Sequence, residues 1–358
     1  MNILDLPEEI AKIDKDNLVS SILKLPDQID QAWREVGQIE IPLDYMRATN
    51  IIVTGMGGSA LCGRIVDALT SEKIRSPFEV STDFRLPNYV DENTLCIVSS
   101  YSGTTEETIE SVSTEVAQSQ GTKIFGITTG NRLADFFKER KIPAYIFNPT
   151  NNPSQQPRMS LGYSVTALLR LLSLLQYLSL SETEIVKVVK FVGQLISDYG
   201  LDKLSNENLA KSLSLKLKGR LPVYIASDHL TGSIHAFKNQ TNENAKTYAN
   251  CFDIPELNHH LMEGLKFPAQ IKQLMTFLFF ESDLYKPEII KRYPLTLEVV
   301  EKNEIQTLTY KMRGSTKLEQ VYELLVLGSF ISYYLAILNG VNPTPIPWVD
   351  YFKDKLSR

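Results

Sequence analysis

The chain reads Ile51-Ile52-Val53-Thr54-Gly55-Met56-Gly57-Gly58-Ser59, a continuous apolar run that leads into a glycine-rich turn. The run predicts a buried strand, and the residues after it predict a helix over about 59–69. Further apolar runs, separated by polar or amphipathic segments, follow at 78–81, 94–99, 123–128 and 144–147. Short apolar strands that alternate with helices are typical of a parallel sheet with helices on both faces. The pattern predicts a doubly wound, flavodoxin-like α/β domain.

The alternation restarts in the second half of the chain. An apolar run at 221–227 precedes an expected helix over about 232–246, and further strands are expected at 246–249, 273–280, 295–300 and 305–310. The turn at 228–233 can be laid over the turn at 54–59, which indicates an internal duplication. We therefore expect a helical segment at 1–48, a first α/β domain at 49–180, and a second at 181–358 that ends in a C-terminal helix.

Composition narrows the class of protein. The 358 residues are 43% hydrophobic and 22% charged, as in ordinary globular proteins, and the net charge is −5. Because no basic stripe stands out, nucleic acid is not an expected partner. An acidic protein can still bind small anions, since backbone N–H groups at helix N-termini supply local positive potential.

Nothing in the sequence predicts export or a membrane span. The first residues have no basic region followed by an apolar run, and no stretch reaches 18 uninterrupted apolar residues. The cysteines, at 62, 96 and 251, are odd in number and widely spaced. They indicate small buried side chains in a reducing compartment, so a cytoplasmic location is expected.

Two turns carry the signs of a binding site. Gly57, Gly58 and Ser59 open the first helix, where glycines let the backbone approach a ligand and the helix N-terminus offers unpaired N–H groups. A tight structural turn is the alternative explanation. The turn lacks the Gly-Lys-Ser/Thr of a P-loop and the full glycine pattern and acidic residue of a dinucleotide site.

The second turn follows the expected strand at 94–99 and reads Ser99-Ser100-Tyr101-Ser102-Gly103-Thr104-Thr105-Glu106-Glu107. Thr-x-x-Glu alone is a capping box, but capping needs one hydroxyl and here there is a cluster. Hydroxyls and backbone N–H groups at a helix start can hold a phosphate without a lysine. We expect a phosphate cradle that includes Ser100, Ser102 and Thr105, beside the carboxyl ends of the strands.

These turns resemble the sugar isomerase (SIS) domain family, whose phosphate loop commonly reads S-x-S-G-x-T. Over some 300 residues the chain is similar to one branch of it, the bifunctional phosphoglucose/phosphomannose isomerases. The landmarks, in order, are residues 55–60, 157–158, 242–246, 255–259 and 350–353. The resemblance implies two SIS domains and a cofactor-free interconversion of glucose 6-phosphate, and of mannose 6-phosphate, with fructose 6-phosphate.

The resemblance also implies catalytic residues. Glu243 is the expected base that moves a proton between C2 and C1 through a cis-enediol, and a place near a helix C-terminus should raise its pKa. His259 is expected to open the sugar ring, although the adjacent His260 is an alternative. Arg158 is expected to hold the oxyanion of the intermediate. Lys353, in the C-terminal helix, is expected over the site.

Three further expectations follow from the resemblance. The histidine reaches the site of the neighbouring subunit, which implies a homodimer with composite sites. Thr344 is proposed to hold a water that lets the enzyme accept either C2 configuration. No metal is expected, since the four histidines and three cysteines show no zinc spacing and zinc-type mannose-phosphate isomerases are all-β cupins.

Two other functions stay open. A non-catalytic SIS sensor could keep the phosphate cradle without Glu243 or His259, but no helix-turn-helix or basic extension is evident. An enzyme of amino-sugar phosphate metabolism is the other alternative. In glucosamine-phosphate synthesis that function normally needs an appended glutaminase with an N-terminal cysteine, and residue 2 is Asn.

Overall fold

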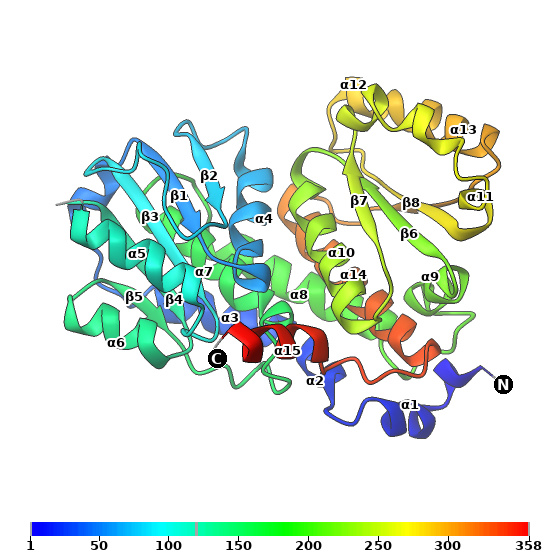
Figure 1. The fold of residues 1–358 in the computed structure, drawn as a ribbon, viewed down its shortest axis with the longest axis horizontal. Coiled ribbons are helices and arrows are strands. Elements are labelled where there is room, and N and C mark those ends of the chain that lie inside the picture. Colours follow the sequence, from blue (N-terminus) through cyan, green and yellow to red (C-terminus); the bar gives the residue numbers. More distant parts are fainter. Residues whose placement is uncertain (1, 119–120, 357–358) are drawn as a thin grey trace.

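The computed structural model describes residues 2–118 and 121–356. Two α/β domains lie side by side, each built on a parallel sheet, with long helices between and beneath them (Figure 1). The first sheet has the strand order β2-β1-β3-β4-β5 and the second the order β7-β6-β8-β9. The first is the flavodoxin-like order, so the expected fold class is confirmed.

The strands span β1 (Asn50–Thr54), β2 (Phe78–Ser81), β3 (Thr94–Ser100), β4 (Lys123–Thr128), β5 (Ala144–Ile146), β6 (Leu221–Ala226), β7 (Asn250–Asp253), β8 (Met275–Glu281) and β9 (Gln306–Lys311). The helices span α1 (Pro7–Ile13), α2 (Leu18–Leu23), α3 (Leu25–Val36), α4 (Leu61–Thr70), α5 (Glu106–Gln118), α6 (Asn131–Glu139), α7 (Leu161–Leu174), α8 (Glu182–Tyr199), α9 (Leu209–Leu217), α10 (Thr231–Asn244), α11 (Ile271–Leu274), α12 (Pro287–Ile290), α13 (Arg292–Lys302), α14 (Lys317–Leu338) and α15 (Pro347–Leu356).

The first sheet buries both faces because its strands send successive side chains to opposite sides. In β3, Leu95 and Ile97 join the large core that extends toward the central helices, while Cys96 and Val98 join a smaller core shared with α5 and α6. A strand buried on both sides needs a continuous apolar run. This is why the runs in the sequence identified these strands.

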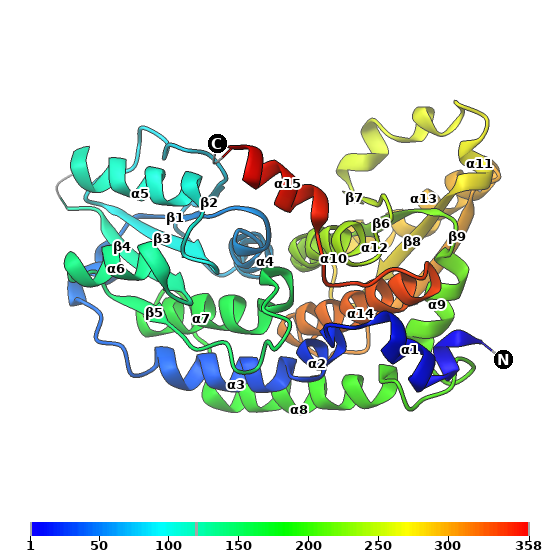
Figure 2. The same cartoon turned by 60° about the horizontal axis from the view of Figure 1, so that its bottom comes forward.

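The central helices join the domains into one body. Figure 2 shows α3 and α8 along the base, beneath α7 and α14. Helix α14 is long and apolar enough to cross a membrane, but its most apolar window is entirely buried inside the protein, as expected of a core helix. These helices pack with both domains. The domain boundaries expected near residues 48 and 180 therefore stay predictions.

The two halves share one plan. In each, the first strand (β1 or β6) leads into a short turn and then a helix (α4 or α10), and the order of the first four strands is the same. Helices α4 and α10 pack against each other in the centre of the molecule. A Cβ on Gly232 would lie 2.4 Å from the Arg64 carbonyl oxygen and 2.5 Å from Ile65 Cα. Gly232 therefore permits the close approach of the two helices.

Two expected strands are wrong. Residues 295–300 belong to helix α13, whose buried residues Tyr293, Thr296 and Val300 have helical spacing and outweigh the β-branched composition. Residues 246–249 form the turn after α10, and the strand begins at Asn250. The turn arises because Lys246 has φ +51°, a left-handed conformation that ends the helix.

Gly232→Ala should lower the free energy of unfolding by about 1–3 kcal/mol, because the new methyl group must push α4 and α10 apart. The matched control is Gly193→Ala on α8, where a Cβ meets nothing within 4 Å. That change should raise the free energy by about 0.5–1 kcal/mol. Urea unfolding measures both, and equal effects would contradict the close packing at Gly232.

Candidate functional site

The candidate site begins at the carboxyl ends of β1 and β3, where the strand order reverses direction. In such sheets this is where ligands bind. The turn after β1 forms the 3-10 helix η3 (Gly57–Ser59), and the loop after β3 leads into α5. The Ser59 hydroxyl accepts a hydrogen bond from the Tyr101 backbone N–H at 2.9 Å. The two predicted binding turns therefore lie together.

Hydrogen bonds within the second turn set its shape. Ser100 Oγ lies 3.0 Å from Thr105 Oγ1 and accepts from the Gly103 N–H at 3.2 Å. Ser102 Oγ accepts from the hydroxyl of Thr104 at 3.1 Å. Gly103 has φ +66°, and a Cβ there would lie 1.9 Å from the Gly130 carbonyl oxygen. The cradle is thus a compact turn that a side chain at position 103 would break.

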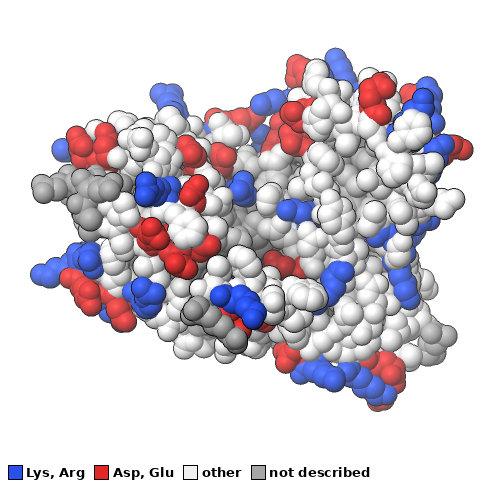
Figure 3. Space-filling model, viewed as in Figure 1, with Lys and Arg blue, Asp and Glu red and all other residues white. Residues whose placement is uncertain are grey.

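The surface around this turn carries both charge signs. Figure 3 shows acidic and basic side chains interspersed over one face, with basic groups also in the hollow between the two domains. An anion held here would therefore depend on hydroxyls, backbone N–H groups and the start of α5 more than on a basic surface.

Arg158 connects the cradle to the second domain. It lies in the 3-10 helix η4 (Pro157–Met159), and a Cβ on Gly58 would lie 3.0 Å from its backbone nitrogen. The residue is 1% exposed. All five of its N–H donors have acceptors: Asn244 Oδ1 at 2.6 Å, Gln156 Oε1 at 2.7 Å, Glu243 Oε2 at 3.3 Å, and the carbonyl oxygens of Pro343 at 3.0 Å and Thr344 at 2.8 Å.

Glu243 lies one residue before the end of α10, as expected. Its neighbours on that helix face, Gln240 and Asn244, both bind Arg158: Gln240 Nε2 donates to the Arg158 carbonyl oxygen at 3.0 Å. Burial raises the pKa of Glu243, and the positive charges of Arg158, Lys246 and Lys353 lower it. The expected upward direction holds, but its leading cause is desolvation.

The C-terminal segment closes the site from a third direction. The carbonyl groups of Pro343 and Thr344 bind Arg158, and α15 follows directly. Lys353 on α15 is exposed and close enough to affect the pKa of Glu243. The Thr344 hydroxyl is buried and finds no acceptor or donor within the described ranges. Figure 1 shows α15 lying across the front of the two domains.

His259 lies at the other end of α10 from Glu243. It ends the 3-10 helix η6 (Glu256–His259), which follows β7, and the neighbouring Asn258 donates to Thr296 of α13 at 2.8 Å. Helix α10 has 14 residues, a length of about 21 Å. Both histidines at 259 and 260 are exposed, and His260 pairs with Glu256 at 2.5 Å. One chain therefore does not bring His259 to Glu243.

The equivalent position in the second domain is closed by side chains. The Ser227 N–H donates to the Tyr285 hydroxyl at 3.3 Å, and the rings of Tyr285 and Tyr293 stack there. Gln320 accepts from Ser282 at 2.6 Å and contacts the His229 ring nitrogen at 2.8 Å. The second domain therefore fills this position with its own large side chains, where the first domain has glycines and small hydroxyls.

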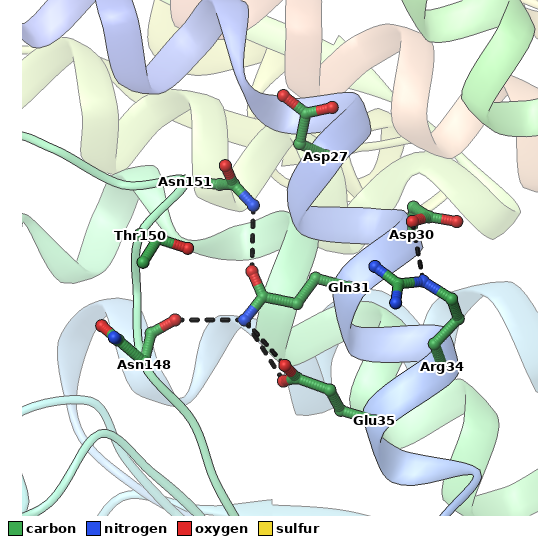
Figure 4. A pocket seen from close by; sticks show the side chains of 8 residues that line it. All are labelled: Asp27, Asp30, Gln31, Arg34, Glu35, Asn148, Thr150 and Asn151. Carbon is green, nitrogen blue, oxygen red and sulfur yellow. Dashed lines mark hydrogen bonds and ion pairs between the residues drawn. The ribbon is translucent and has the colours of Figure 1, made fainter.

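Figure 4 shows an open pocket of about 510 Å³ that lies against α3, at the start of the segment leading to Arg158. Its side chains bind one another: Gln31 Nε2 donates to Glu35 and to the Asn148 carbonyl oxygen, and Asn151 donates to Gln31 at 2.9 Å. Further along, Asn152 donates to the Tyr101 hydroxyl at 2.9 Å. The network ties the segment before Arg158 to α3 and to the cradle.

The structure therefore brings together Gly58, Ser59, the 100–105 turn, Arg158 and Glu243, and places Thr344 and Lys353 beside them. Three partners of Arg158 were not predicted from the sequence: Gln156, Gln240 and Asn244. The helical spacing of Gln240, Glu243 and Asn244 was a usable signal, because residues three and four apart share a helix face. Nothing local pointed to Gln156.

The chain is similar to known proteins in sequence and in fold. Residues 206–356 match the family model described as the bacterial phospho-glucose isomerase C-terminal SIS domain. The chain is 33% identical to the bifunctional phosphoglucose/phosphomannose isomerase of Caldicellulosiruptor bescii, over 95% of this chain and 99% of that one. It is 30% identical to the enzyme of the same name from Thermoplasma acidophilum, over 86% and 90%.

The fold is also found in solved structures. The tagatose-6-phosphate ketose/aldose isomerase of Escherichia coli superposes with a TM-score of 0.64 at 16% identity, covering 94% of this chain and 93% of that one. At this identity the likeness shows a shared fold.

Asn244→Leu should lower the free energy of unfolding by about 1–3 kcal/mol, because it leaves a buried guanidinium N–H without an acceptor. Combining it with Arg158→Met removes both partners, so the double variant should lose less stability than the sum of the single changes. Urea unfolding of the four proteins gives the coupling energy. Strictly additive losses would contradict the contact.

Proposed function

Because this chain belongs to the bifunctional phosphoglucose/phosphomannose isomerase family, we propose that it interconverts glucose 6-phosphate and mannose 6-phosphate with fructose 6-phosphate. The proposed reaction is a metal-free proton transfer in the cytoplasm. The observation that carries the proposal is the contact of the glycine turn at Gly58 with Arg158, whose guanidinium pairs with Glu243 at 3.3 Å. The proposed anion cradle and the Glu243 carboxylate are thus adjacent.

The phosphate is proposed to bind Gly57, Gly58, Ser59, Ser100, Ser102 and Thr105. Its two negative charges are stabilised by the N–H groups and partial positive charge at the start of α5. With the phosphate held there, C1 and C2 of the open-chain sugar extend toward the end of α10. Binding energy from the phosphate, which does not react, positions the carbons that do.

Glu243 then acts as the base. It removes the proton from C2 of the aldose to give the cis-enediol and returns it to C1 to give the ketose. The first step needs the ionised carboxylate and the second needs the carboxylic acid formed by the first, so a raised pKa suits this exchange. Because the enediol is planar at C2, glucose and mannose phosphates lead to the same intermediate.

Arg158 is proposed to hold the oxyanion of the intermediate. Since all five of its donors have acceptors, one of them must be released to the substrate. The bond to Glu243, at 3.3 Å, is the longest of the five, so the Nη1 donor is the one we assign. The exchange would free the carboxylate for the C2 proton at the same moment.

Ring opening is assigned to His259 of a second copy. The separation of His259 from Glu243 along α10 supports a homodimer in which each histidine reaches the partner's site. The ring of His260 is engaged by Glu256, which favours His259 for this role. Lys353 is proposed to act over the site, and the buried Thr344 hydroxyl, which finds no partner in residues 2–118 and 121–356, supports the proposed water at C2.

Glu243→Gln should abolish the exchange of the C2 proton of glucose 6-phosphate with deuterated solvent and lower kcat by about 10²- to 10⁴-fold. Binding of a non-reacting phosphate analogue should be kept, because the cradle is unchanged. NMR of the substrate in D₂O measures the exchange. Near-normal exchange in this variant would show that another group is the base.

Mixing separately inactive Glu243→Gln and His259→Ala subunits should restore activity. In a mixed dimer one composite site has both mutations and the other has neither, so random exchange gives about one quarter of the wild-type rate. The control is each variant refolded alone. Mixtures that stay as inactive as the single variants would indicate that both residues act within one chain.

A further inference from the structure

Lys246 lies beside the proposed catalytic groups and is not one of them. It follows the last residues of α10, three positions after Glu243, in the left-handed conformation with φ +51°. Lysine is not a usual residue there, because a Cβ disfavours this conformation and glycine or asparagine is preferred. An interaction of its side chain has to compensate for the strain.

The ammonium group folds back over the helix end. Lys246 Nζ donates to the Glu243 carbonyl oxygen at 2.6 Å and to the Pro343 carbonyl oxygen at 3.1 Å. The first acceptor is one of the terminal carbonyl groups that a helix leaves without an internal donor. The second is the same oxygen that accepts from Arg158 Nη2 at 3.0 Å. Lys246 thus ties the backbone of Glu243 to the segment that precedes α15.

We propose that Lys246 is a positioning residue of the isomerase site. It joins the end of α10 to the Pro343 carbonyl oxygen and thereby fixes the positions of Glu243 and of α15, which carries Lys353, relative to Arg158. The proposal rests on the proposed function of this site. Arg158 of η4 and Lys246 of the turn after α10 both donate to the Pro343 carbonyl oxygen. With one of them removed, the 343–344 segment has fewer bonds to hold the start of α15.

The position also has an electrostatic consequence. The charged groups that face Glu243 are Arg158 from η4, Lys246 from the turn after α10 and Lys353 from α15, and each lowers the pKa that burial raises. Asp350 of α15 acts on Arg158. Burial and the charge of Arg158 lower the pKa of Lys246 itself to about 8, so it carries its charge at neutral pH. Removing that charge must raise the pKa of Glu243 further.

Lys246→Gly separates this role from folding. Glycine accepts φ +51° without strain, so the variant should unfold at the same temperature as the wild type or higher. Because a base works only when ionised, the acid limb of its kcat/KM profile should move to higher pH. Loss of positioning should lower kcat on the plateau by about 10- to 10²-fold. Lys246→Arg keeps the positive charge and a hydrogen-bond donor, so the acid limb of its kcat/KM profile should lie at the wild-type pH.

The control is Lys302→Met, which removes an exposed lysine paired with Glu298 on α13 and should leave the limb in place. The titration of the Glu243 carboxyl carbon, followed by ¹³C NMR and identified with Glu243→Gln, gives a readout that does not need activity. An inactive wild type would refute the proposed function, while the titration would still decide the role of Lys246. The proposal would be overturned if Lys246→Gly changed neither the titration of Glu243 nor the acid limb of the kcat/KM profile. It would also be overturned if the acid limb of Lys246→Arg lay at the same pH as that of Lys246→Gly.

Discussion

The buried guanidinium of Arg158 is the constraint on which the rest of the site depends. A charged group removed from water is costly unless every donor finds an acceptor. Here the acceptors come from α10, from the segment before η4 and from the backbone that precedes α15. Each of these elements must therefore lie within hydrogen-bond distance of one residue, which itself packs against the glycine turn of the first domain. The hydrogen bonds of this one cation fix the relative positions of the proposed phosphate cradle, Glu243 and the C-terminal helix.

The duplicated plan explains how the two domains contribute different parts of this site. Both have the same strand order around a switch point, but the first keeps glycines and small hydroxyls there while the second is filled by tyrosines and a buried glutamine. Because α10 runs back from the closed switch point of the second domain, its end reaches Arg158 in the first. The second domain, whose switch point is closed by side chains, supplies Glu243. The contact between α4 and α10, which Gly232 permits, sets the distance between the two contributions.

The same helix separates the two proposed proton-transfer groups. Glu243 lies at the end of α10 and His259 beyond the sheet edge where that helix starts, so a rigid helix of 14 residues keeps them apart within one chain. A proposed partner subunit resolves this without any change in the fold. It also accounts for the exposure of His259, because a side chain that serves another copy has to project from its own.

The sequence by itself determined the α/β class and the strands around the 100–105 turn, and it predicted phosphate binding at that turn and Glu243 as the base, because apolar runs, turn residues and motif spacing are local properties of the chain. It misplaced 295–300, where β-branched composition conflicted with the helical spacing of the residues that become buried. The tertiary structure alone decided that Arg158 is buried with five acceptors, that Gln156, Asn244 and Lys246 surround it, and that His259 lies away from Glu243. These are distances between segments up to 186 residues apart, and no local pattern encodes them.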